Sequence, residues 1–230
     1  MIGIIGAMDI EVEKLKKLLT DTKQEKISGV DFHSGKIGKT DVVIAKCGVG
    51  KVFAAICAET MILCYKPDII INIGVAGGLS EKLKIGDIVI ADSVVQHDMD
   101  TTALGDEAGF LSDIGLVKIP ADKTAVDTLK AACDKLSVNY EVGTVASGDQ
   151  FISDAAAKER IKSLFSAKAC EMEGGAIGHV CYVNNVPFGT LRAISDGAND
   201  GAKLDFPTFA ALAAENSAKV IEIFIDTFKR

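Results

Sequence analysis

Two apolar segments near the C-terminal end of the chain, residues 169–177 and 188–196, carry charged side chains. The charged residues in these segments are Glu171, Glu173, Arg192 and Asp196. Charged side chains rarely enter a protein interior unless they are paired or take part in chemistry. We therefore interpret the group as a candidate functional site, in which carboxylates would bind a polar substrate or transfer protons.

Length and charge limit the possible classes of protein. The chain has 230 residues, of which 48% are hydrophobic, and this is enough to bury one large core. No linker-like segment or internal repeat divides it, so we expect a single domain over residues 1–230. The formal net charge is −7 and the two signs are interspersed, which argues against binding to nucleic acid or to an anionic membrane.

Cysteine usage and the N-terminal segment indicate the compartment. The six cysteines form no CxxC pair and no zinc-type cluster with histidine, so they behave as small apolar residues. The N-terminus lacks a basic region followed by a long apolar stretch, and no run of apolar residues is long enough to span a membrane. The sequence therefore predicts a cytoplasmic protein that needs no metal and no cofactor.

Hydrophobic periodicity predicts alternating strands and helices. Several strands are almost continuous apolar runs, which is typical of strands buried on both faces. Such a pattern predicts an α/β protein, a three-layer α/β/α sandwich around a mixed, largely parallel twisted sheet. We expect strands over 2–5, 30–35, 41–47, 68–73, 87–95, 140–146, 167–171 and 188–194, and helices over 8–19, 51–65, 122–137, 154–165, 174–184 and 207–229, with 98–122 irregular.

The polar residues that interrupt this pattern follow the carboxyl ends of predicted strands, where α/β sheets bind their ligands. They are Glu11, the glycine-rich segment 74–78, Gln150-Phe151, Glu171 to Glu173, and Asp196. Each has an ordinary explanation when taken alone. Glu11 could be a helix N-terminal charge, Asp196 an N-cap, and one of the two neighbouring glutamates the partner of Arg192 in a buried salt bridge. Their convergence on one edge favours a site.

Common nucleotide-binding and catalytic motifs are absent. Gly38-Lys39-Thr40 ends like a P-loop, but the glycine required five residues earlier is His33, and no GxGxxG follows the first strand. No G-x-S-x-G elbow accompanies the three histidines. We interpret His97-Asp98 as a loop anchor and His179 as a packing residue. ATP chemistry, dinucleotide binding and a serine triad are therefore excluded.

Seven ordered motifs resemble a known family over residues 2 to about 226. The motifs are Gly3-Ile-Ile-Gly-Ala-Met-Asp-Ile-Glu11, Gly48-Val-Gly-Lys51, Ala76-Gly-Gly-Leu79, Gly86-Asp-Ile-Val89, Ser147-Gly-Asp-Gln-Phe151, Glu171-Met-Glu173 and Arg192-Ala-Ile-Ser-Asp196. With these motifs the chain resembles the 5′-methylthioadenosine/S-adenosylhomocysteine nucleosidases of the nucleoside phosphorylase superfamily. The resemblance implies a homodimer that acts on a small adenosine-type molecule and water.

The resemblance implies roles for individual residues. Asp196 would protonate N7 of the leaving adenine, and Glu11 would activate the attacking water. Glu173 would bind the ribose hydroxyls and be oriented by Arg192. The remaining substrate-binding positions would be Met8, Val75, Ala76, Phe151, Ile152, Met172 and Phe206, with Phe151 stacking on adenine and the Ile152 backbone reading its edge.

Two further expectations follow from the resemblance. The segment 101–112 would reach across the dimer to close the 5′-substituent pocket of the partner, through Thr101, Leu104 and Phe110. Leu104 stands where an aromatic residue is common in the family, so the choice among methylthio, homocysteinyl, 5′-deoxy and aminofutalosine substrates stays open.

Water and phosphate are the alternative nucleophiles in this superfamily. A phosphorylase needs cationic groups for the phosphate dianion, yet no arginine precedes Arg160, and Glu11 would repel an anion. The sequence therefore predicts a hydrolase that cleaves 5′-methylthioadenosine, S-adenosylhomocysteine and 5′-deoxyadenosine. The alternatives are a phosphate-dependent purine or uridine phosphorylase and a non-catalytic nucleoside-binding module.

Overall fold

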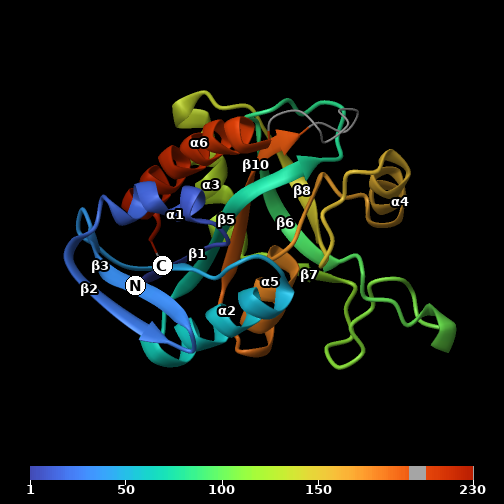
Figure 1. The fold of residues 1–230 in the computed structure, drawn as a ribbon, viewed down its shortest axis with the longest axis horizontal. Coiled ribbons are helices and arrows are strands. Elements are labelled where there is room, and N and C mark those ends of the chain that lie inside the picture. The colour runs from blue at the N-terminus through green and yellow to red at the C-terminus, as the bar shows by residue number, and fades with distance from the viewer. Residues whose placement is uncertain (197–205, 230) are drawn as a thin grey trace.

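The computed structural model describes residues 1–196 and 206–229, without the side chains of 206–208 and 210. One sheet runs through the centre of the molecule and helices cover it on both faces (Figure 1). Its strands are β1 (Ile2–Gly6), β2 (Thr20–Ile27), β3 (Val30–Ile37), β4 (Thr40–Lys46), β5 (Ile69–Gly78), β6 (Ile88–Gln96), β7 (Lys118–Pro120), β8 (Tyr140–Ser147), β9 (Ala169–Glu171) and β10 (Phe188–Asp196). The helices are α1 (Asp9–Lys16), α2 (Lys51–Tyr65), α3 (Lys123–Leu136), α4 (Ala155–Phe165), α5 (Gly174–Val183) and α6 (Phe206–Thr227).

The sheet is mixed and closes on itself at one end. Strand β1 pairs in parallel with β4 and β5, and β5 pairs in parallel with β10. Strand β5 also pairs with β9, while β9, β8, β6 and β10 follow one another, so these strands form a ring. The antiparallel strands β2 and β3 extend the open end beyond β4. Because β5 belongs to both parts, its carboxyl end lies next to those of β1, β9 and β10.

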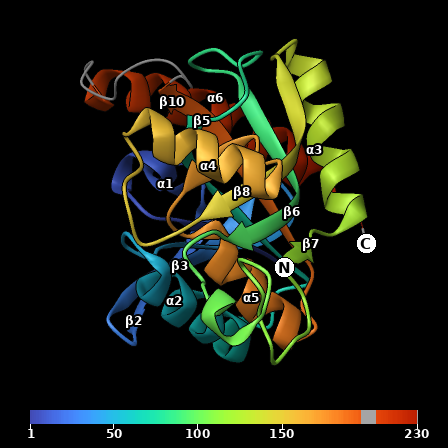
Figure 2. The same ribbon diagram turned by 90° about the vertical axis from the view of Figure 1, so that its right-hand side faces the viewer.

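Helices α1, α3 and α6 cover one face of the sheet, and α2 and α5 cover the other (Figures 1 and 2). Each face has its own apolar cluster: Leu15, Leu129 and Phe224 belong to the first, and Cys57, Met61 and Ile177 to the second. Helix α4 packs on β8 and β9 through a third, smaller cluster that includes Ile161 and Phe165. The three-layer α/β/α arrangement predicted from the sequence is confirmed.

The helix boundaries follow capping chemistry. Asp122 and Asp154 each accept a hydrogen bond from the backbone amide three residues later, at 2.9 Å, and so begin α3 and α4. Helix α1 ends at Lys16, earlier than the predicted residue 19.

One strand was not predicted, and one predicted strand boundary needs correction. Strand β2 was not predicted, because Thr20–Ile27 is a mostly exposed edge strand without apolar alternation. Strand β5 continues through Gly78, whereas the sequence pattern predicts its end at residue 73. The glycines of 74–78 are therefore strand residues. At Gly74, the neighbouring side chains of Glu11 and Arg192 leave no room for a Cβ. Within 98–122, the predicted irregular segment, the structure has only a short 3₁₀ helix (Thr102–Leu104) and β7.

Candidate active site

A cavity of about 200 Å³ opens at the carboxyl ends of β1, β5, β9 and β10. Its walls combine apolar surface with four carboxylates, which is typical of a site for a small organic molecule with a few polar groups. The lining residues are Ala7, Met8, Glu11, Val49, Val75, Ala76, Gly77, Gln150, Phe151, Ile152, Cys170, Glu171, Met172, Glu173, Ser195 and Asp196.

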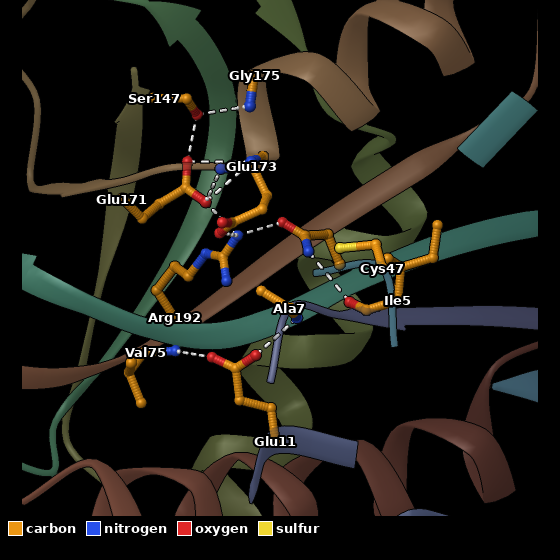
Figure 3. A network of polar contacts seen from close by, with 12 residues as sticks. Ile5, Ala7, Glu11, Cys47, Val75, Ser147, Glu171, Glu173, Gly175 and Arg192 are labelled. Carbon is orange, nitrogen blue, oxygen red and sulfur yellow. Dashed lines mark hydrogen bonds and ion pairs between the residues drawn. The ribbon is translucent and has the colours of Figure 1, made fainter. Parts of the chain in front are cut away.

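Glu11 is a buried carboxylate held by backbone amides. Its Oε2 accepts hydrogen bonds from the amides of Ala7 (2.7 Å) and Met8 (2.9 Å). Its Oε1 accepts one from Val75 (3.0 Å), and Figure 3 shows the contacts with Ala7 and Val75. The hydrogen bond from the Met8 amide also caps the first turn of α1. Glu11 is therefore both a helix-capping residue and a candidate catalytic residue. Burial raises the pKa of Glu11, while the Arg192 charge and the three amides oppose that rise.

Arg192 and Glu171 form a wholly buried ion pair. The Nη2 of Arg192 contacts Glu171 Oε2 and also donates to Asn72 Oδ1. Glu171 accepts further hydrogen bonds from the Ser147 hydroxyl (Figure 3) and from the backbone amides of Glu173 (2.9 Å) and Gly174. A carboxylate that accepts this many hydrogen bonds from the protein has a structural role. The sequence analysis suggested such a role for one of the two glutamates, as the partner of Arg192 in a buried salt bridge.

Glu173 has a different environment. Its Oε1 accepts a hydrogen bond from the Gly50 amide at 2.9 Å, and its Oε2 lies 3.8 Å from Arg192 Nη2. The predicted orientation of Glu173 by Arg192 is thus a weaker contact than the pair with Glu171. Burial, followed by the Glu171 charge, raises the pKa of Glu173 to about 7. Glu173 is therefore a carboxyl group that changes charge near neutral pH.

Asp196 ends β10 and lines the cavity. Its Oδ1 accepts a hydrogen bond from the Ser195 hydroxyl at 3.0 Å, and its Oδ2 lies 2.9 Å from the Nζ of Lys158. The pairing of β10 with β5 shifts by one residue just before Asp196, which turns this side chain toward the cavity. The sequence did not identify Lys158 as part of the site. Its place in the buried stripe of α4, with Ile161 and Phe165, was the available signal.

Two glycines of β5 allow the charged groups to approach one another. A Cβ on Gly74 would lie 2.7 Å from Glu11 Oε1 and would collide with Arg192 Nη1. A Cβ on Gly77 would lie 3.1 Å from Asp196 Oδ2. The strand therefore passes between the carboxylates of the site without a side chain to separate them.

The structure brings most of the predicted site residues together. Met8, Val75, Ala76, Phe151, Ile152 and Met172 line the cavity with Glu11, Glu173 and Asp196. Arg192 is fully buried behind the cavity wall and is not among the lining residues. Phe206 begins α6, but its side chain lies outside the described part of the chain.

The predicted partner-subunit residues do not line the cavity of their own chain. Thr101, Leu104 and Phe110 belong to the green segment that projects from the body beside α4 and β7 (Figure 1). Leu104 is 83% exposed.

The two histidine interpretations concern residues outside the cavity. Asp98 accepts hydrogen bonds from Lys51 Nζ (2.6 Å) and from the Asp149 amide (2.9 Å), so it ties its loop to two others. His179 contacts Gln96 through Nδ1 at 3.2 Å. Among the described residues, no group of histidine, cysteine or acidic side chains has the arrangement of a metal site. Within the same part of the chain, no helix is long and apolar enough to cross a membrane.

The family model of the phosphorylase superfamily matches residues 1–226. The α/β fold of this chain, with its carboxylate-lined cavity at the strand ends, is therefore that of a phosphorylase-superfamily protein. A curated 5′-methylthioadenosine/S-adenosylhomocysteine nucleosidase from Staphylococcus aureus is 41% identical over 226 residues, which cover 98% of this chain and 99% of that protein. The chain belongs to the 5′-methylthioadenosine/S-adenosylhomocysteine nucleosidase family of this superfamily.

Solved structures agree with this assignment. The nucleosidase of Neisseria meningitidis in complex with methylthio-immucillin-A superimposes with a TM-score of 0.95 at 32% identity, covering 99% of each chain. The futalosine hydrolase of Helicobacter pylori gives a TM-score of 0.94 at 33% identity, covering 99% of this chain and 97% of that one. A nucleosidase and a futalosine hydrolase thus both have folds very similar to that of this chain.

Proposed function

We propose that this protein hydrolyses the N-glycosidic bond of 5′-methylthioadenosine, S-adenosylhomocysteine and 5′-deoxyadenosine, releasing adenine and the 5′-substituted ribose. The observation that carries the proposal is that the buried carboxylates of Glu11 and Asp196 line one cavity, Glu11 beside Gly74 of β5 and Asp196 beside Gly77. Breaking this bond needs a nucleophile on one side of the sugar and a proton for the departing base on the other. The family assignment supports the same reaction.

Glu11 activates the nucleophile, which is a water molecule. It takes a proton from water as the water oxygen bonds to C1′, and its negative charge stabilises the positive charge that develops on the ribosyl ring. Its three backbone hydrogen bonds fix both oxygens, so little reorganisation is needed during the reaction. Arg192 Nη1 lies near Glu11 Oε1 beside Gly74, and its positive charge favours the charged form of that carboxylate.

Asp196 serves the leaving group. As the bond between C1′ and N9 breaks, its electron pair moves into the purine, and Asp196 delivers a proton to N7. Phe151 stacks on the base, and the backbone of Ile152 reads the base edge. Both residues line the cavity and follow β8 in the chain.

Glu173 binds the ribose. A carboxylate accepts hydrogen bonds from both hydroxyls of a vicinal diol, and the hydroxyl donors favour its charged form. Met8 and Met172 provide apolar surface beside it, and Phe206 is proposed to complete the 5′ side.

Hydrolysis is favoured over phosphorolysis because the cavity is acidic. Among residues 1–196 and 206–229, the cavity lining includes four carboxylates and no lysine or arginine, so a phosphate dianion would be repelled there. The same pair of acids disfavours a binding module without catalysis, since binding adenosine does not require a carboxylate on each side of the sugar.

We also propose a homodimer. Val52, Phe53, Ile56 and Leu63 leave an exposed apolar stripe on α2, and Tyr182 and Val183 add to it on α5. A large exposed apolar surface of this kind is typical of a subunit interface. The stripe begins next to Val49, which is 51% exposed and lines the cavity, so a second copy seated here would reach the cavity mouth. The partner's segment with Thr101, Leu104 and Phe110 is proposed to close it.

Domain organisation and compartment complete the proposal. We propose one domain over residues 1–230, supported by the single sheet that takes strands from Ile2 to Asp196. We place the enzyme in the cytoplasm, which agrees with six free cysteines.

The decisive experiment is adenine release in phosphate-free buffer from a panel of 5′-substituted adenosines. The panel contains 5′-methylthioadenosine, S-adenosylhomocysteine, 5′-deoxyadenosine and aminofutalosine. Adenine release without phosphate supports the hydrolase. Turnover that depends strictly on added phosphate would contradict it and favour the phosphorylase alternative.

A further inference from the structure

Lys158 is a buried cation that has no place in the reaction described so far. It lies on the inward face of α4 with Ile161 and Phe165, at the i, i+3, i+7 spacing of an apolar stripe. Its side chain is only 4% exposed. Lysine is almost never this deeply buried unless it is paired, and an apolar residue would fill the same position at no electrostatic cost.

The head group of Lys158 reaches the proposed acid of the reaction. Its Nζ lies 2.9 Å from Asp196 Oδ2, and the Asp196 side chain is itself only 12% exposed. In the described part of the chain, two neutral groups also lie near Asp196: the Ser195 hydroxyl on Oδ1 and the thiol of Cys170 near Gly77. Burial raises the pKa of the Cys170 thiol to about 12, so it stays protonated.

We propose that Lys158 is a positioning residue that makes Asp196 a stronger acid toward the leaving base. This inference rests on the proposed function of Asp196. When the O–H bond of Asp196 breaks and the N–H bond at adenine N7 forms, a carboxylate appears in a buried place. The neighbouring ammonium stabilises that carboxylate as it forms, and the two groups hold each other against the cavity wall.

The same ammonium limits the pH range in which the acid works. An adjacent positive charge favours the ionised form of a carboxyl group, whereas burial favours the neutral form. Replacing Lys158 by a neutral residue removes the first effect and leaves the second. The high-pH side of the kcat/KM profile should therefore respond to the charge at position 158.

The test is the pH profile of 5′-methylthioadenosine hydrolysis by Lys158→Met. Methionine suits the apolar stripe of α4, so the fold is retained, but Asp196 loses its cation. We expect the high-pH limb of the kcat/KM profile to shift to higher pH by about one unit or more. We also expect kcat at low pH to fall roughly tenfold, because the acid is weaker.

Two further variants separate charge from packing. Lys158→Gln keeps a hydrogen-bond donor without charge and should shift the limb as methionine does, so it replaces Lys158→Met if that variant does not fold. Lys158→Arg keeps the charge and should leave the limb close to its parental place. The matched control is Lys162→Met, one turn along α4, whose side chain is 36% exposed and pairs with Glu81 and Glu159. It should keep the parental profile.

The outcomes distinguish the inference from the proposed function. If the parent protein releases no adenine from any substrate of the panel, the proposed function fails. If the parent is active and the neutral variants keep its pH profile and its kcat, Lys158 only fills space and the inference is overturned. A uniform loss of activity without a shift of the limb would also overturn it.

Discussion

The Oε1 of Glu11 accepts a hydrogen bond from the backbone amide of Val75 at 3.0 Å, although the two residues lie 64 positions apart. This contact joins the first turn of α1 to the middle of β5. It fixes the carboxylate relative to the strand that also faces Asp196 and Arg192. The position of the proposed base is thus set by the sheet and not by the helix alone.

Glu11→Gln tests the base directly. Glutamine has nearly the same volume, but it cannot take a proton from water, and its amide group replaces one of two oxygens that accept backbone amides. We expect kcat for 5′-methylthioadenosine to fall by about 10²- to 10⁴-fold, with the fold retained by circular dichroism. Glu13→Gln, on the exposed side of α1, is the matched control and should keep full activity. Parental turnover by Glu11→Gln would rule out Glu11 as the base.

Asp196→Asn tests the acid. The asparagine can still hydrogen-bond to the base but cannot donate a proton with the same ease, so substrate should bind while kcat falls by about 10²-fold or more. Binding is measured by isothermal titration calorimetry and turnover by adenine release. A variant that turns over as fast as the parent would contradict the mechanism.

The raised pKa of Glu173 predicts a pH-dependent stability. Because the group has a pKa of about 7 in the folded protein and an ordinary value of 4.5 when unfolded, the folded state holds the extra proton between these values. The free energy of unfolding therefore decreases as pH rises from about 4.5 to 7, since the unfolded state ionises more easily.

Glu173→Gln removes this ionisation. We expect the variant to gain on the order of 1–3 kcal/mol relative to the parent at pH above about 7, and little below about pH 4.5. Thermal unfolding at the two pH values measures the difference. An equal change at both would show that the effect comes from packing.

Gly74→Ala tests the close approach across β5. The new methyl group would lie 2.7 Å from Glu11 Oε1 and would collide with Arg192 Nη1. The Val75 amide holds Glu11 Oε1, and the contacts of Nη2 with Glu171 and Asn72 hold Arg192 in place. We expect a loss of activity of at least about 10²-fold together with a lower melting temperature. Gly78→Ala is the comparison in the same strand. Its methyl group would meet Ile194 Cγ2 at 3.3 Å, an apolar neighbour, so its effect should be milder.

Phe53→Glu tests the dimer. A charge in the exposed apolar stripe of α2 should give a monomer in analytical ultracentrifugation, with a higher KM because the 5′ side of the cavity is left open. Leu212→Glu places the same charge at a residue of α6 that is 50% exposed and should stay dimeric. A parent protein that sediments as a monomer would contradict the proposal at once.

The sequence predicted the layers of the fold and most of the cavity because both depend on local patterns. Apolar runs marked the buried strands, and Glu173 and Asp196 were conspicuous as acids beside such runs. Strand β2 was missed because an exposed edge strand has no apolar periodicity. Its place is fixed by pairing with β3, a contact that forms only in the folded chain.

The charge contacts of the site were harder to predict. Position 158 looks like an ordinary helix lysine until α4 is docked and Asp196 is found beside it. Likewise, the sequence could place Arg192 near two glutamates, but only the geometry distinguishes its close partner, Glu171, from the more distant Glu173.

The proposed base is held by the main chain, and this has a consequence for how such a site can diverge. Ala7, Met8 and Val75 hold Glu11 through amide groups that nearly every amino acid possesses. Their side chains, which line the cavity, are free to change without moving the carboxylate. A chain of this kind can acquire a new substrate by replacing the residues around its base while the bond-breaking chemistry is inherited unchanged.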